Sequence, residues 1–147
     1  PVHWTGTPCE MERILYIANK NNIHIVEDAC HAITSSYKKR NAGSFGISGC
    51  FSMHPLKNLN VWGDGGVICS DDIDFNNKVR LLRNHGLVDR DNCEIFAYNS
   101  RLDTFQSVVG NWLLPKAHTI ANQRIKNAKY FDKKFNLIKK LVQSIWL

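Results

Sequence analysis

The sequence predicts an α/β protein in which a mostly parallel sheet is flanked by helices, with a long helix at the C-terminal end. An apolar segment at residues 1–4, a helical pattern at 7–22 and a second apolar segment at 23–28 succeed one another with short links. This strand–helix–strand order indicates a parallel pair of strands joined by a crossing helix. Two more strand-like segments follow, and apolar residues recur at helical spacing from Leu102 onward.

The first helix is predicted to begin with Thr7 as its N-cap and Pro8 in its first position, where a missing N–H is tolerated. Its apolar side chains recur at the spacing of one helix face, at Met11, Ile14, Leu15 and Ala18. The segment 23–28 predicts a short buried strand that ends in two acids. Residues 36–46 are polar and contain glycine, which predicts a loop.

Two further strands are predicted at residues 48–54 and 65–70, on either side of a turn that carries Lys57 and ends in "GDGG". The segment 71–87 begins with acids and ends near Gly86, which favours a helix. The next stretch, "DRDNCEIFAYNSR", is irregular.

The remainder of the chain is predicted to be helical, with a bend near Pro115 because proline interrupts the backbone hydrogen bonds of a helix. Residues 118–141 form one long amphipathic pattern. Their basic residues predict a solvated helix face, and attraction of a phosphorylated substrate or of nucleic acid is the alternative. Nucleic acid is the weaker alternative, since no binding motif accompanies the charge.

Composition restricts the class of protein. The chain has 147 residues, 44% of them hydrophobic, and a net charge of +6, which suits one ordinary globular domain. No apolar run is long enough to span a bilayer, and no leader peptide is recognisable. The five cysteines are irregularly spaced and include no CxxC pair, which predicts free thiols in a reducing cytoplasm.

Two charged residues stand where a ligand site is expected. Asp28 ends a predicted parallel strand, and open α/β sheets bind ligands at the carboxyl ends of their strands. A helix cap or a hydrogen-bonded loop acid is the alternative interpretation of Asp28. Lys57 lies between Pro55 and the "GDGG" turn, so it is held at a constrained point. A partly desolvated lysine can lose its proton and attack a carbonyl, whereas most lysines are simply solvated.

Ser52, at the end of the preceding strand, has a hydroxyl that can donate to a phosphate or bond to its own backbone. His31 follows Asp28 by three residues and is either a donor to a bound ring or a loop histidine. A strand-end acid, a lysine and a phosphate-binding hydroxyl together are what pyridoxal 5'-phosphate (PLP) requires. The acid keeps the pyridine nitrogen protonated, and the lysine holds the aldehyde and moves protons.

Four segments resemble, in order and in approximate spacing, the DegT/DnrJ/StrS family of PLP-dependent sugar aminotransferases. They are "VEDACHA", "GSFGISGCFSMHPLKNLNVWGDGGVICS", "LLRNHGL" and "YNSRLDTFQSVVG". The resemblance extends from about Pro1 past Gly110, and the terminal helix matches more loosely. It implies that residues 1–115 are part of the PLP-binding large domain of a fold-type I PLP-dependent transferase. Residues 116–147 would then be a helix leading toward a small C-terminal domain that is missing here.

The resemblance also implies roles for individual residues. Lys57 would be the Schiff-base lysine, Asp28 the partner of the pyridine nitrogen, and Ser52 a ligand of the cofactor phosphate. His31 stands where the family has glutamine or histidine near the cofactor 3-hydroxyl. In family dimers an asparagine at the position of Asn99 reaches the phosphate held by the neighbouring subunit. Arg101 belongs to the same segment and is expected to help there, and the "GDGG" glycines are expected to shape the turn.

The resemblance implies an aminotransferase that moves an amino group, with glutamate as the expected donor, to a keto sugar on a nucleotide carrier. Surface glycans are the expected destination, the cytoplasm the expected location and a homodimer the expected full-length assembly. Relatives that dehydrate a keto-deoxysugar carry histidine in place of the lysine, so Lys57 favours transamination.

One departure from the family is large, because the upstream segment that binds phosphate and stacks on the ring does not precede Pro1. The chain is therefore expected to be the middle of the enzyme and inactive by itself. A catalytically incomplete remnant with an assembly or regulatory role is the alternative. Metal binding by His24, Glu27, Cys30 and His31 is disfavoured, because alternation along the strand directs His24 and Glu27 to opposite faces.

Overall fold

A small mixed sheet forms the centre of the molecule. The computed structural model describes residues 1–145, and its central sheet has the strand order β1-β4-β5, with β1 at Val26–Asp28, β4 at Ser48–Ser52 and β5 at Gly66–Cys69. β1 pairs with β4 in parallel, whereas β4 and β5 are antiparallel. Val2 adds a parallel bridge to Asp28 on the outer side of β1. The mostly parallel sheet is thus confirmed for this part of the fold, with β5 as its antiparallel member.

The first helix, α1 (Met11–Lys20), begins later than predicted. Its N-cap position is Glu10, so the assignment of Thr7 as N-cap and Pro8 as first helical residue is wrong. The reason lies in the preceding turn η1 (Trp4–Gly6), because the backbone N–H of Thr7 donates to the Trp4 carbonyl at 2.9 Å. This segment is bonded to the N-terminal residues and not to the helix.

The predicted loop at residues 36–46 contains a short hairpin. β2 (Ser36–Tyr37) and β3 (Arg40–Asn41) pair antiparallel around Lys38 and Lys39. Both turn residues have positive φ, 48° and 68°, which is the conformation of a two-residue hairpin turn. Asn-Gly or Asp-Gly usually signals such a turn, and a pair of lysines gave no such signal.

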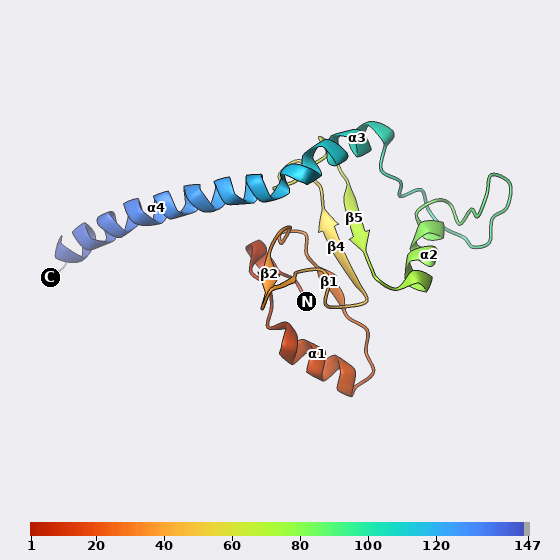
Figure 1. Ribbon diagram of the computed structural model, residues 1–147, viewed down its shortest axis with the longest axis horizontal. Coiled ribbons are helices and arrows are strands. Elements are labelled where there is room, and N and C mark those ends of the chain that lie inside the picture. Colours follow the sequence, from red (N-terminus) through yellow and green to blue (C-terminus); the bar gives the residue numbers. More distant parts are fainter. Residues whose placement is uncertain (146–147) are drawn as a thin grey trace.

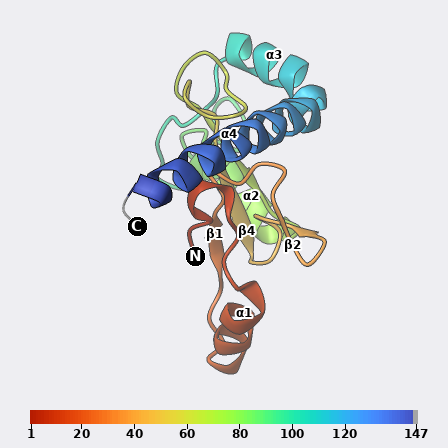
Figure 2. The ribbon, with the colours of Figure 1, turned by 90° about the vertical axis from the view of Figure 1, so that its left-hand side faces the viewer.

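Helices occur in the second half of the chain where they were predicted, but the helix expected over residues 71–87 ends at Leu82 and residues 83–103 are irregular. α2 (Ile73–Leu82) is capped by Asp72, whose side chain accepts from the backbone N–H of Phe75 at 2.8 Å. α3 (Thr104–Leu113), the 3₁₀ turn η2 (Leu114–Lys116) and α4 (Ala117–Ile145) follow, with Pro115 inside η2. α1 and α3 lie at opposite ends of the strands in Figure 1 and in Figure 2, and α4 extends away from the sheet.

In the described part of the chain, the buried core includes three small clusters. One lies between α1 and the start of β1 (Met11, Ala18, Ile25), one follows β1 (Ala29, Ala32, Ala42), and one lies under the loop after β4 (Met53, Leu59, Val61). Large apolar side chains on α4 are exposed, among them Phe131 and Phe135. None of the helices in the described part of the chain is long and apolar enough to cross a membrane.

Candidate active site

A cavity of about 770 Å³ lies beyond the carboxyl ends of β1 and β4. Three residues predicted from the sequence line it together, namely His31, Ser52 and Lys57. The other lining residues are Thr5, Cys30, Ile33, His54, Leu56, Asn58, Asp64 and Gly65. Of these, the sequence analysis considered Cys30 only as a metal ligand, and Asp64 and Gly65 only as parts of the turn. The volume lies within the usual range for small-molecule sites. The position agrees with the rule that open α/β sheets bind ligands at strand ends.

Asp28 lies beside this cavity on the same face of the sheet as Ser52. It pairs with Cys50 in the β1–β4 register, and Ser52 is two residues farther along the strand. One carboxylate oxygen, Oδ1, accepts from the backbone N–H of Cys30 at 3.0 Å. Hydrogen bonds from the Cys30 side chain and backbone lower the pKa of Asp28, and the charges of His31 and Lys57 act in the same direction. The acid is therefore held in its ionised form.

Lys57 is half-buried in a turn that local hydrogen bonds define. Its backbone N–H donates to the His54 carbonyl at 2.9 Å, and the N–H of Leu56 donates to Nδ1 of His54 at 3.1 Å. The loop that carries Lys57 closes between β4 and β5, where the backbone N–H of Met53 donates to the Gly65 carbonyl at 2.8 Å. These bonds place the lysine at the mouth of the cavity and account for its constrained setting in the sequence.

The loop after Lys57 is anchored to α3. The side-chain amide of Gln106 donates to the Asp64 carbonyl at 2.8 Å, and Trp62 packs against Phe105 with ring centroids 5.9 Å apart. A Cβ at Gly65 would come within 2.8 Å of side chains of Leu102 and Val61, so this glycine permits close approach of the backbone. The "GDGG" turn thus has the structural duty that was expected of it.

Ser52 and His31 form two further parts of the cavity wall. The Ser52 hydroxyl accepts from the backbone N–H of His54 at 3.3 Å, and such a hydroxyl still has its own hydrogen to donate. The His31 ring lies 5.2 Å from the exposed indole of Trp4, tilted by 55°. Thr5, the residue after Trp4, has φ 54° and also lines the cavity.

Asn99 and Arg101 do not line this cavity. Both are exposed, and Oδ1 of Asn99 accepts from Nε of Arg101 at 3.2 Å. A guanidinium nitrogen of Arg101 also donates to Oδ1 of Asn84, at 3.1 Å, which ties the segment to the loop after α2. Their proposed role in a neighbouring subunit therefore stays a prediction.

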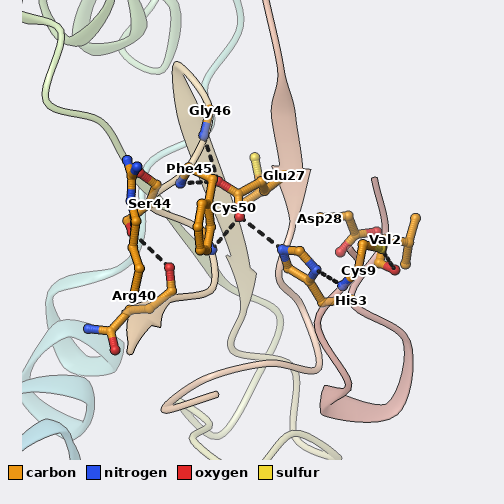
Figure 3. A network of polar contacts seen from close by, with 12 residues as sticks. Val2, His3, Cys9, Glu27, Asp28, Arg40, Ser44, Phe45, Gly46 and Cys50 are labelled. Carbon is orange, nitrogen blue, oxygen red and sulfur yellow. Dashed lines mark hydrogen bonds and ion pairs between the residues drawn. The ribbon is translucent and has the colours of Figure 1, made fainter. Parts of the chain in front are cut away.

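A buried polar pair next to the cavity was missed. His3 and Glu27 are both 0% exposed, and Nε2 of His3 lies 2.9 Å from Oε2 of Glu27. Figure 3 shows the two side chains facing each other. Sequence analysis considered Glu27 only as a metal ligand. Alternation along β1 already directs Glu27 away from the face of Asp28, and a histidine within an apolar strand-like segment was a second signal. Among residues 1–145, no cluster of three His, Cys, Asp or Glu side chains is arranged to hold a metal ion.

Comparison with known proteins agrees with this geometry. The sequence profile of the DegT/DnrJ/EryC1/StrS aminotransferase family matches residues 1–145. A UDP-N-acetyl-3-dehydro-alpha-D-glucosamine 3-aminotransferase of Acidithiobacillus ferrooxidans is 41% identical over 109 residues, covering 74% of this chain and 30% of the relative. A dTDP-3-amino-3,4,6-trideoxy-alpha-D-glucose transaminase of Streptomyces venezuelae is 38% identical, covering 74% of this chain and 29% of the relative.

Solved structures show the same fold. Helicobacter pylori PseC, an aminotransferase involved in the biosynthesis of pseudoaminic acid, superposes with a TM-score of 0.85 at 27% identity, covering 90% of this chain and 36% of that one. A Brucella abortus aminotransferase gives 0.84 at 28% identity with the same coverage. The chain spans 30–40% of the length of the first curated relatives that it matches. The resemblance seen in the sequence is confirmed, and the chain belongs to the DegT/DnrJ/EryC1/StrS aminotransferase family.

Proposed function

We propose that the protein containing this chain is a PLP-dependent aminotransferase that transfers an amino group, from glutamate, to a keto sugar on a nucleotide carrier. The observation that carries the proposal is that Lys57, Ser52 and His31 line one cavity, with the ionised carboxylate of Asp28 beside it. The relatives named above act on UDP- and dTDP-linked sugars by their names, which supports the substrate class. Surface-glycan synthesis is the proposed destination of the product, as a match to a spore coat polysaccharide biosynthesis protein suggests.

The residues present fit PLP. An amine, a hydroxyl and a carboxylate are the groups that its aldehyde, phosphate and pyridine nitrogen need, and the cavity of about 770 Å³ has room for the ring. When bound, this cofactor supplies an electron sink for cleavage of a bond at the substrate amine carbon.

Each side chain then has a defined task. Lys57 would hold the cofactor aldehyde and would move a proton at the substrate carbon. Asp28 would keep the pyridine nitrogen protonated, because its own lowered pKa leaves it negatively charged. Ser52 would hold the phosphate through its hydroxyl, and His31 would contact the cofactor near its ring oxygen.

Asn99 is proposed to complete the site of a second subunit in a homodimer, with Arg101 orienting it. The bond from Nε of Arg101 to Oδ1 of Asn99 leaves the amide nitrogen of Asn99 as the group that can donate to a phosphate. Exposure of both residues supports this assignment, because a residue that serves a neighbouring subunit must lie on the surface of its own.

The test is substitution of Lys57 in the protein expressed from its complete reading frame. Lys57→Ala is expected to lower turnover by at least about 100-fold, the lower limit for loss of a positioned proton-transfer group. Lys57→Arg should fail as well, because a guanidinium does not deprotonate in proteins. Amino transfer from glutamate to a nucleotide-linked keto sugar is measured, and the exposed Lys39→Ala serves as the matched control.

A second measurement identifies the attachment point independently of turnover. Reduction of the PLP-loaded protein with borohydride followed by peptide mass spectrometry should locate the cofactor on the peptide that contains Lys57. Full activity in Lys57→Ala, or cofactor attached to another lysine, would contradict the proposal.

A further inference from the structure

We propose that the buried His3–Glu27 pair is a positioning device for the cofactor site, holding Asp28 and the Trp4–Thr5 segment, of which Thr5 lines the cavity, in one fixed arrangement. This inference rests on the proposed function, because it assigns the pair a task in binding PLP. Neither residue contacts the cavity, so both act through other residues.

Glu27 is a fully buried carboxylate with a complete set of donors. Its Oε2 atom accepts from Nε2 of His3 at 2.9 Å and from the backbone N–H of Gly43 at 2.7 Å. Its Oε1 atom accepts from the backbone N–H of Gly46 at 2.7 Å and from that of Phe45. Figure 3 shows these contacts joining β1 to the loop after β3. A buried charge is tolerated at such a site because every strong acceptor position is used.

Ionisation of Glu27 is favoured in spite of its burial. Removal from water alone would raise the pKa of Glu27, but the hydrogen bonds from His3, Gly46, Gly43 and Phe45 together lower it. The carboxylate therefore remains a permanent acceptor for His3 at neutral pH.

His3 connects this carboxylate to Asp28. Its Nδ1 atom accepts from the backbone N–H of Cys9 at 3.1 Å, so its hydrogen must reside on Nε2, which donates to Glu27. The backbone N–H of His3 donates to the Asp28 carbonyl at 2.9 Å, and the N–H of Asp28 donates to the Pro1 carbonyl at 2.9 Å. His3 thus bonds both to the backbone of Asp28 and to the side chain of Glu27.

The rim of the cavity continues directly from His3. Trp4 packs against His31, and Thr5 lines the cavity. Gly6, at φ 88°, lies so close to the His31 carbonyl that a Cβ there would be 3.1 Å from its oxygen. Displacement of His3 would therefore shift both Asp28, beside the cavity, and His31, in its wall. The residues of a binding site must be placed to within about 0.5 Å of their productive positions, so such a shift is expected to lower the affinity for PLP.

The test compares PLP affinity with stability. His3→Leu removes both ring nitrogens, whereas His3→Gln keeps a donor within reach of Glu27. Leu15→Ala, on a half-buried face of α1 that packs against Met11, Ala18 and Ile25, lowers stability and removes no hydrogen bond of the network. PLP is titrated by its absorbance into each folded variant of the protein expressed from its complete reading frame, and unfolding is followed separately in urea.

His3→Leu is expected to weaken PLP binding by about tenfold or more, the scale on which supporting partners of a ligand residue act. His3→Gln should recover part of that loss, and Leu15→Ala should bind PLP as the parent protein does. Equal affinity in His3→Leu and the parent, or an equal loss in Leu15→Ala, would overturn the inference. Failure of the parent protein itself to bind PLP would instead remove the proposed function, and the inference with it.

A readout that needs no cofactor completes the design. Nitrogen-15 NMR of histidine-labelled protein should show His3 as the neutral Nε2–H tautomer, with its signal assigned by loss in His3→Leu. In Glu27→Gln the Nε2–H resonance should move, because an amide replaces its carboxylate acceptor. An Nδ1–H tautomer in the parent protein would contradict the arrangement on which the inference depends.

Discussion

Glu27 and Asp28 are adjacent acids on β1, but the two faces of the strand give them opposite surroundings. The Glu27 side chain is fully buried and accepts four hydrogen bonds, three of them from one backbone loop. The Asp28 side chain is exposed beside the cavity, and its one backbone donor is Cys30. The pKa of both acids is lowered, so both are charged at neutral pH. Chemical type and ionisation alone therefore do not separate a buried structural acid from an exposed acid beside the cavity, whereas burial and the direction of the side chain do.

The contrast between buried Glu27 and exposed Asp28 is tested most strongly by removing each carboxylate in turn. Glu27→Ala leaves His3 and three backbone N–H groups without their acceptor, so we expect a loss of about 3–5 kcal/mol in the free energy of unfolding. Asp28→Ala loses only the hydrogen bonds from Cys30 to an exposed carboxylate and should cost about 1 kcal/mol or less. Urea denaturation followed by far-UV circular dichroism measures both, and similar costs for the two substitutions would show that the contrast between the faces is wrong.

A glycine in the Glu27 loop tests the same contrast through the backbone. A Cβ at Gly46 would lie 2.1 Å from the Ile25 carbonyl oxygen, so Gly46→Ala must move the loop and should cost about 1–3 kcal/mol. The matched control is Gly63→Ala in the loop after Lys57. Its Cβ would meet only the end of the flexible Gln106 side chain, at 2.9 Å, so a smaller cost is expected. If Gly63→Ala cost as much stability as Gly46→Ala, the loop that binds Glu27 would be no less tolerant of change than the loop after Lys57, and the contrast would be wrong.

Acid unfolding gives the smallest expected effect. The folded-state pKa of Glu27 lies below its ordinary value of 4.5, so the unfolded chain takes up the proton first as the pH falls. The stability that Glu27 contributes is complete above pH 4.5 and is lost as the pH falls through the lowered folded-state pKa. The Asp28 contribution has the same sign and begins to decline below its ordinary value of 3.8.

Glu27→Gln should accordingly lower the number of protons taken up on unfolding by up to one, beginning near pH 4.5. Asp28→Asn should alter the dependence only at lower pH. The measurement is the urea midpoint at a series of pH values, and an unchanged dependence in Glu27→Gln would show that Glu27 has the same pKa in the folded and unfolded chains.

Much of the fold follows from the sequence because its signals are local. Strand–helix–strand order predicted a parallel pairing of residues 1–4 with 23–28, which the structure reduces to the bridge between Val2 and Asp28. Acids at residues 71–72 predicted the start of α2, and Pro115 predicted the break between α3 and α4. The start of α1 was wrong because a tertiary contact decides it. Cys9 donates its backbone N–H to the ring of His3, and no local pattern shows that bond.

The candidate site divides in the same way. Asp28, Ser52 and Lys57 stand at strand ends and turns that local rules identify, and the structure places Ser52 and Lys57 in one cavity with Asp28 beside it. Asn99 and Arg101 were identified only through the family, and within one chain nothing tests their role. The His3–Glu27 pair depends on two segments 24 residues apart, so only three-dimensional structure connects them.

The pairing of β1 with β4 has a consequence for folding errors. A slip of one residue along β4 would exchange the two faces, turning Asp28 into the interior and Glu27 into the solvent. Aspartate is one methylene shorter than glutamate, so the slipped strand would present a side chain of the wrong reach to the donors of residues 43–46. Glu27 thereby favours the one register in which its carboxylate reaches the backbone donors of residues 43–46.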